Sequence, residues 1–199
     1  MYNSIGDSSM YTIKKEISGE LVVKSSKFIC VLYHIEDIDD VENHLDYLRK
    51  KYKDATHICY AYRLENTEKF NDDGEPSGTA GFPMMSLLKK KNINNVLAVV
   101  IRYFGGTKLG AGGLIRTYQK AVSDTLANAN LEEMVLFNYY DLTASYDDLK
   151  LLNTLTVDYV IIGKAFNRNI IYKIKVEQNK DNVEETFKNT NIKIKKLNN

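Results

Sequence analysis

The pattern of hydrophobic and polar positions predicts strands first and then a mixture of strands and helices. Residues 11–13, 21–23 and 28–33 are short apolar runs of strand character, and residues 19–20 are expected to turn the first two into a hairpin. Residues 57–64 alternate and are rich in aromatic and β-branched side chains, as in a strand of a sheet. The beginning of the chain is therefore predicted to be rich in strand.

The hydrophobic period changes to that of a helix in three places. Apolar side chains recur at helical spacing over residues 41–52, and Asp37, Asp39 and Asp40 ahead of them are expected to supply an N-cap and favourable charge at the helix start. Pro83 suits the first turn of a second helix. A third helix is expected to begin at Gly112 or Gly113, with an apolar stripe wide enough to pack across a sheet.

Residues 96–101 form an apolar run without alternation, which is typical of a central strand covered on both faces. The run is far too short to cross a membrane, which takes about 20 apolar residues. The first residues lack a basic start followed by an apolar stretch, so no signal peptide is expected. We therefore predict a cytoplasmic protein with no membrane partner.

The pattern from residue 139 onward indicates strand, helix, strand, strand, helix and strand. This βαββαβ order is that of a ferredoxin-like domain. The preceding helical pattern stops near residues 131–137, so we place a boundary there, between domains of residues 1–136 and 137–199. The predicted fold class is α+β with two domains.

Charge and cysteine content narrow the class of protein. With 27 Lys and Arg against 26 Asp and Glu, the net charge is +1, so any nucleic-acid site must be a local basic one. Cys30 and Cys59 lie inside apolar runs and are expected to be reduced and buried. Residues 138–199 carry 10 Lys and Arg against 8 Asp and Glu, a mild positive bias. Five lysines lie on the predicted strands of this part: Lys173, Lys175, Lys193, Lys195 and Lys196.

The stretch RYFGGTKLGAGGLIRTY, residues 102–118, holds five of the eleven glycines. A strand, a glycine-rich loop and a helix N-terminus in this order suit an anion, because unpaired N–H groups and the helix dipole point at it. The spacing fits neither a Walker loop nor a dinucleotide fingerprint. Alternatively, the glycines serve only a tight bend and close helix packing. The candidate anion-binding residues are Arg102, Gly105, Gly106, Lys108, Gly110, Gly112, Gly113 and Arg116.

A second candidate, DDGEPSGTAG at residues 72–81, lies in a long loop expected over residues 66–81. Long ordered loops with such polar content often carry binding residues. Its carboxylates would suit Mg²⁺ or acid and base chemistry, but Asp-Gly and Glu-Pro are also common turn formers, so a structural or recognition loop is favoured. The recognition residues proposed here are Asp72, Asp73, Glu75, Ser77 and Thr79.

Nucleophilic catalysis would need Ser77 or Cys59 together with His57. His57 and Cys59 share one face of a strand, yet no third residue completes the arrangement, and a buried cysteine beside a satisfied histidine is favoured. No Cys and His spacing typical of metal ligands occurs. We predict no catalytic residue, no metal and no cofactor.

Four stretches together resemble the YigZ/IMPACT family: KSSKFI, DATHICYAYRL, DDGEPSGTAGFPMM and the glycine-rich stretch described above. They cover most of residues 20–130. The resemblance implies an N-terminal α+β domain like those of ribosomal proteins and elongation factors, with helices on one face of a β-sheet. It also implies a ferredoxin-like C-terminal domain similar to the last domain of the translocation elongation factor. Eukaryotic relatives regulate translation through a partner that is not carried over, because their second domain differs.

The favoured function is a non-enzymatic binding or regulatory protein of the translation apparatus, a monomer that contacts RNA or a ribosome-associated protein. Arg102, Lys108 and Arg116 would then meet phosphate while glycine amides fix the register. The alternative is a hydrolase of peptides or phosphoesters that uses the carboxylates of residues 72–75 with a divalent metal. A third option is a protein-interaction module without a ligand site.

Overall fold

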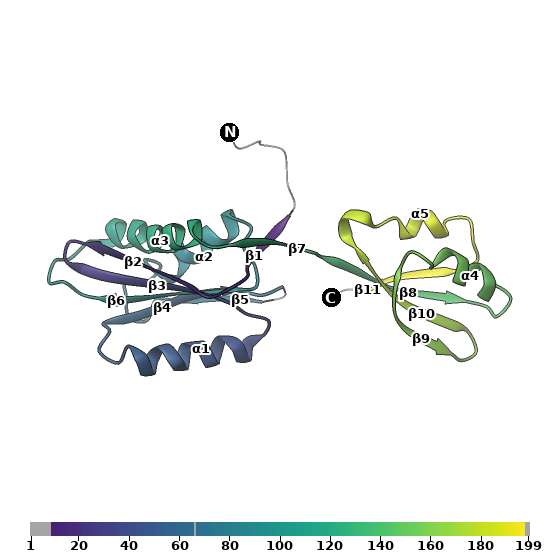
Figure 1. Ribbon diagram of the computed structural model, residues 1–199, viewed down its shortest axis with the longest axis horizontal. Coiled ribbons are helices and arrows are strands. Elements are labelled where there is room, and N and C mark those ends of the chain that lie inside the picture. Colours follow the sequence, from purple (N-terminus) through teal and green to yellow (C-terminus); the bar gives the residue numbers. More distant parts are fainter. Residues whose placement is uncertain (1–8, 66, 198–199) are drawn as a thin grey trace, which may run out of the picture. The chain divides into compact units, whose positions relative to one another are not determined.

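The computed structural model describes residues 9–65 and 67–197 and divides into two compact units, Met1–Met134 and Val135–Asn199 (Figure 1). The prediction about a signal peptide rests partly on residues 1–8, which lie outside the described residues. Asn66, the first residue of the expected long loop, also lies outside them. In the part of the chain that the structure describes, no helix is long and apolar enough to cross a membrane.

The N-terminal unit is built on a five-stranded sheet in the order β2-β3-β6-β4-β5, with antiparallel neighbours throughout. A separate two-stranded sheet pairs β1 with β7. The elements follow the order β1 (Met10–Ile13), β2 (Ile17–Val23), β3 (Ser26–His34), α1 (Ile38–Lys51), β4 (His57–Arg63), β5 (Glu68–Asn71), α2 (Gly81–Lys90), β6 (Val96–Tyr103), α3 (Ala111–Ala127) and β7 (Leu131–Met134).

The hairpin turn expected at residues 19–20 lies elsewhere, and that prediction was wrong. Residues 19–20 belong to the middle of β2, and the chain turns into β3 at Lys24 and Ser25, whose φ angles are 46° and 62°. Two consecutive positive φ values suit a two-residue hairpin, because such a turn matches the twist of the strands. Gly19 instead lets α3 approach β2, since a Cβ there would lie 2.6 Å from Thr125 Oγ1.

The sheet of the N-terminal unit is covered on both faces (Figure 1). Residues of α2 and α3, among them Met84 and Tyr118, pack on one face, and α1 packs on the other through Leu45 and its neighbours. The prediction that residues 96–101 form a central strand covered on both faces is confirmed, because β6 is fully buried there. The expectation of helices on one face only has to be corrected, since a strand without polar positions needs cover on both sides.

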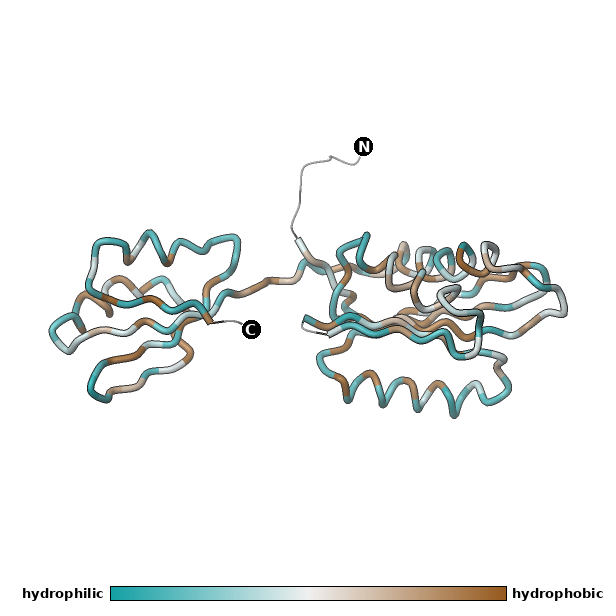
Figure 2. The backbone as a smooth tube through the Cα atoms, turned by 180° about the vertical axis from the view of Figure 1, so that it is seen from behind, coloured by the Kyte–Doolittle hydropathy of each residue, from teal (hydrophilic) through white to brown (hydrophobic). Residues whose placement is uncertain are grey.

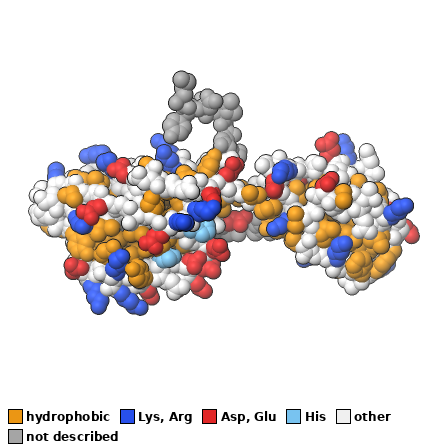
Figure 3. Space-filling view, viewed as in Figure 1, with side chains coloured by type: hydrophobic (Ala, Val, Ile, Leu, Met, Phe, Trp, Pro, Cys, Tyr) orange, Lys and Arg blue, Asp and Glu red, His pale blue; other side chains and the backbone are white. Residues whose placement is uncertain are grey.

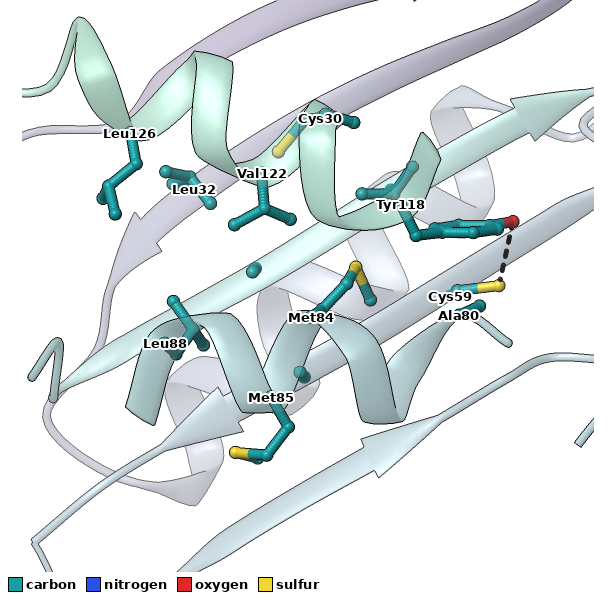
Figure 4. Packing of buried hydrophobic residues seen from close by; sticks show 14 of the residues in the cluster. Cys30, Leu32, Cys59, Ala80, Met84, Met85, Leu88, Tyr118, Val122 and Leu126 are labelled. Atoms are coloured by element: carbon teal, nitrogen blue, oxygen red, sulfur yellow. Dashed lines mark hydrogen bonds between the residues drawn. The ribbon is translucent and has the colours of Figure 1, made fainter. Parts of the chain in front are cut away.

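Local sequence explains how these layers form. Of the three aspartates expected at the start of α1, Asp37 is the N-cap, because it accepts a hydrogen bond from the Asp40 amide, 2.9 Å away, and Asp39 and Asp40 lie in the first turn. The tube in Figure 2 alternates between hydrophobic and hydrophilic along α1, as expected for a helix with one face toward the sheet. Figure 4 shows side chains of α2 and α3 meeting those of the sheet, which makes this layer a closed apolar core.

The C-terminal unit has the βαββαβ order predicted from the sequence, and its four-stranded antiparallel sheet has the order β11-β8-β10-β9 of a ferredoxin-like fold. The α+β class with two units is therefore confirmed. The strand that the sequence predicts over residues 157–162 begins later, at Val160, because the chain first turns after Thr156, whose hydroxyl donates to the Leu152 carbonyl. The elements are β8 (Phe137–Ala144), α4 (Leu149–Leu155), β9 (Val160–Phe166), β10 (Ile170–Glu177), the short 3₁₀ helix η1 (Gln178–Lys180), α5 (Val183–Phe187) and β11 (Lys193–Leu197).

Candidate functional site

The two loops singled out in the sequence line one cleft of about 410 Å³ in the N-terminal unit. They meet because β4 and β6 are neighbours in the sheet, with His57 and Arg102 paired in register. The lining residues are Thr56, His57, Glu75, Pro76, Arg102, Phe104, Lys108, Leu109, Gly110, Ala111 and Leu114. This mixture of apolar walls and a few convergent polar groups is typical of a binding site.

The N-terminus of α3 opens into this cleft. The helix starts after Gly110, which has a φ of 74° and carries no side chain that could cap the helix. The first turn of α3 contains no acidic residue, so the partial positive charge of the helix end is not neutralised locally. Lys108 on the lining and Arg116 one turn into α3 are both exposed. The helix end therefore presents amide groups to the cleft beside Lys108, and the Arg116 guanidinium lies near Gly112 in the first turn of α3.

The glycines of the loop divide between the two roles considered from the sequence. Gly105 lies so close to the β2–β3 turn that a Cβ would be 2.0 Å from the Ser25 carbonyl carbon, so it serves packing. A Cβ on Gly113 would lie 3.0 Å from Leu109 Cβ, which is tight. Gly106 and Gly110 have positive φ angles, and a Cβ added to either would meet no described atom within 4 Å, so they shape an open loop. Gly112, in the first turn of α3, is exposed.

Arg102 is buried, with its side chain only 6% exposed, and it pairs with a carboxylate rather than standing free. Its Nη1 donates to Glu75 Oε1 at 2.6 Å, and its guanidinium lies between the rings of Phe28 and Phe104. Its Nε has no hydrogen-bond partner among the described residues. Arg102 therefore lies in the wall of the cleft as the neutralising partner of Glu75.

Glu75 is the centre of a buried polar network. Its Oε1 accepts hydrogen bonds from both Arg102 Nη1 and the Tyr118 hydroxyl, at 2.6 and 2.7 Å. Its Oε2 lies 3.9 Å from His57 Nε2. Since the Glu75 side chain is only 3% exposed, this carboxylate depends on these partners for its charge to be tolerated. The network ties β4, β6 and α3 together behind the cleft.

His57 is oriented by the loop of residues 72–81. Its Nδ1 lies 2.7 Å from the Asp73 carbonyl oxygen, which only accepts hydrogen bonds, so Nδ1 carries a proton. In the neutral ring, Nε2 is then an acceptor beside Glu75 and the cleft. The histidine is thus a fixed polar group of the site.

The other members of the loop have structural partners. Asp72 accepts hydrogen bonds from the amides of Gly78, Ala80 and Gly81, and so caps the start of α2. Asp73 accepts from the Ile58 amide at 2.6 Å. Thr79 is buried and its hydroxyl donates to the Pro76 carbonyl, whereas Ser77 is exposed.

The three carboxylates of residues 72–75 therefore point to three different partners and do not converge. Within residues 9–65 and 67–197, no group of three or more His, Cys, Asp or Glu side chains could hold a metal ion. These three residues therefore do not form the converging set of carboxylate ligands that the hydrolase alternative would use for a divalent metal.

We expect Asp72→Ala to lower the free energy of unfolding by about 2 kcal/mol, because three amide groups at the start of α2 lose their acceptor. Urea denaturation followed by circular dichroism measures this change. Ser77→Ala in the same loop is the matched control and should change stability by less than about 0.5 kcal/mol. Equal stabilities of the two variants would contradict the capping role.

Cys59 lies in the core, and burial raises the pKa of its thiol. Its Sγ lies 3.0 Å from the Asp72 carbonyl oxygen. It also lies 3.4 Å from the Tyr118 hydroxyl, a contact drawn in Figure 4. The thiol is therefore protonated and packed, as predicted for a buried cysteine, and is unsuited to act as a nucleophile. Cys30 is also a free, buried cysteine.

The site residues proposed from the sequence leave out several residues of the site, among them His57 and the two aromatic residues Phe104 and Tyr118. Phe104 lines the cleft with its side chain exposed, and Tyr118 completes the network behind it. The signal for Phe104 was an aromatic residue directly before two glycines in a loop. No sequence signal singles out Tyr118 from the other apolar positions of α3, because its hydroxyl partner lies far away in the chain.

Comparison with known proteins identifies the family. The model of the Impact N-terminal domain matches residues 24–126. IMPACT family member YvyE of Bacillus subtilis is 38% identical, with 87% of this chain and 82% of that protein covered. IMPACT family member YigZ of Escherichia coli is 30% identical, with 76% and 78% covered. A crystal structure of a hypothetical protein has a TM-score of 0.68 at 26% identity, covering 96% and 98%. The resemblance seen in the sequence is confirmed, and this chain belongs to the IMPACT family.

Proposed function

We propose that this chain is a non-enzymatic binding protein of the translation apparatus whose cleft takes a phosphate group of RNA. The observation that carries the proposal is the meeting of the uncapped start of α3 with Lys108 in a cleft. Membership of the IMPACT family supports the link to translation. We also propose that the protein is a monomer and is located in the cytoplasm. The alternative partner to RNA is a ribosome-associated protein that carries a phosphate group.

The chemistry of the cleft favours an anion with an apolar or aromatic part. Arg102 neutralises Glu75, so the buried carboxylate does not repel a phosphate, and Lys108 with Arg116 supplies exposed positive charge. Phe104, which is 46% exposed, stands on the lining and offers a flat surface for a base. Both signs of charge are spread over the visible face in Figure 3, so this local arrangement, rather than the net charge, supports binding.

The test is the binding of ribosomes and of a structured RNA at several salt concentrations. Removing Lys108 and Arg116 together by alanine substitution is expected to make the dependence of log K on log salt shallower by about 0.7–0.9 for each lost phosphate contact. The control pair, Lys50→Ala with Lys90→Ala, removes the same charge from the ends of α1 and α2. An unchanged slope, or an equal change in the control pair, would reject the cleft as the RNA site.

A further inference from the structure

The sheet of the C-terminal unit is covered by helices on one face only (Figure 1). Alternate side chains of β8 and β10, among them Leu142 and Ile174, are buried beneath α4 and α5, which contribute Leu152 and Phe187 to the same cluster. The positions between them, including Asp141 and Lys173, point to the opposite face. That second face is open within the part of this unit that the structure describes.

Four lysines gather on this open face, which we call the lysine face. Lys173 and Lys175 alternate along β10, and Lys193 and Lys195 alternate along β11, so each pair shares one side of its strand. The two pairs of lysines lie on either side of β8, which is the strand between β10 and β11. Lys173 of β10 and Lys195 of β11 are both register partners of Asp141 on β8. Lys173, Lys193 and Lys195 are exposed, whereas Lys175 is half-buried.

Aromatic side chains accompany these lysines. Phe137 and Tyr139 have the same alternation on β8 as Asp141, so they belong to the lysine face, and Tyr139 is the register partner of Lys175. The Lys175 ammonium lies 4.6 Å from the centre of the Phe137 ring. A hollow of about 450 Å³, lined in part by Phe137 and Lys175, opens at this end of the sheet. The face therefore combines positive charge with flat rings.

The charges of this face favour a polyanion. Glu177, at the end of β10, pairs with Lys180 at 2.5 Å and adds little negative charge. Asp141 is the carboxylate at the centre, and its Oδ1 is buried without a hydrogen-bond partner among the described residues. The four lysines and Asp141 together give the lysine face a net charge of +3. The pairing of β8, β10 and β11 fixes the distances between these charges.

We propose that the lysine face binds single-stranded RNA. The lysines would contact phosphates, and Phe137 and Tyr139 would stack on bases. Duplex RNA hides its bases from such rings, and an anionic membrane would leave the two aromatic rings without a role. This proposal uses residues that the cleft does not, so it goes beyond the proposed function and does not depend on it.

The experiment measures the affinity of the full chain for labelled single-stranded RNA of about 12 nucleotides, by fluorescence anisotropy at several salt concentrations. Lys173→Ala with Lys195→Ala is expected to weaken binding about tenfold and to make the salt dependence shallower by about 1.4, or 0.7 per lost contact. Tyr139→Leu is expected to weaken binding about fivefold without changing the slope, because stacking releases no counterions. Thermal melts check that each variant is folded.

Matched controls separate this surface from net charge and from the cleft. Lys150→Ala with Lys188→Ala removes the same charge from exposed positions on α4 and after α5, and should leave the affinity unchanged. The loss caused by the Lys173 and Lys195 changes should persist when Lys108 and Arg116 are already alanine, so the two sites fail or succeed separately. Equal losses in both lysine pairs, tighter binding of duplex RNA, or binding of anionic vesicles but not of RNA would overturn the proposal.

Discussion

Glu75→Ala is expected to lower the free energy of unfolding of the N-terminal unit by about 3–5 kcal/mol, because it leaves a buried charge without its partner. Arg102 is 6% exposed and pairs with Glu75 at 2.6 Å, so its guanidinium would lose its counterion in a site that water barely reaches. The Tyr118 hydroxyl would lose its acceptor in the same substitution. Chemical denaturation followed by far-ultraviolet circular dichroism gives the change.

An exposed ion pair provides the control for this prediction. Glu68 pairs with Lys89 and, at 3.7 Å, with Arg63, and because Glu68 and Lys89 are about half exposed, Glu68→Ala should cost less than about 1 kcal/mol. Replacing both Glu75 and Arg102, by leucine and methionine, should restore much of the loss, because no unpaired charge then remains. If Glu75→Ala lowers the free energy of unfolding no more than Glu68→Ala does, the buried network around Glu75 does not stabilise the N-terminal unit as proposed.

Gly105→Ala is expected to destabilise the N-terminal unit by about 3 kcal/mol or more, since the added methyl group has no room. Its Cβ would lie 2.0 Å from both the carbonyl carbon and the oxygen of Ser25, and 2.4 Å from the Ser26 amide nitrogen. These are backbone atoms of the β2–β3 turn, so a side-chain rotation cannot relieve the clash. Thermal and urea denaturation both measure the effect.

Gly112→Ala is the matched control for this prediction. The added Cβ would meet only the end of the Arg116 side chain, at 3.4 Å, and the position is helical, where alanine is favoured over glycine. We expect stability within about 1 kcal/mol of the natural protein, or slightly above it. A Gly105→Ala protein as stable as Gly112→Ala would show that the loop moves freely, against the packing described for it.

Much of the fold was predictable because local sequence and tertiary packing agree in several places. Asp37 caps α1 as its position suggests, and the unbroken apolar run of residues 96–101 marks a strand covered on both faces. The strand β5 was missed because all four of its residues are exposed at the sheet edge and show no apolar alternation. The β2–β3 turn was missed because Lys24 and Ser25 adopt positive φ without the glycine that usually signals it.

The site was predictable in its segments but not in its contacts. The stretch of residues 102–118 is marked by its glycines, and the loop of residues 72–81 is marked by glycines together with three carboxylates. That they share a cleft depends on β4 and β6 being neighbours, and the Arg102 and Glu75 pair joins residues 27 positions apart. Residue types alone could not show that Arg102 is already neutralised, because this depends on which carboxylate the fold brings to it. The family motifs located the site, and the structure assigned the roles.

The claim at the centre of this account is that the start of α3 receives a phosphate group. The most direct measurement is a titration of the ¹⁵N-labelled full chain with a short RNA carrying a terminal phosphate, followed by the amide resonances. We expect saturable shifts of Ala111, Gly112 and Gly113, and their loss in Lys108→Ala. Shifts that leave these three amides unaffected while other surfaces respond would contradict the account.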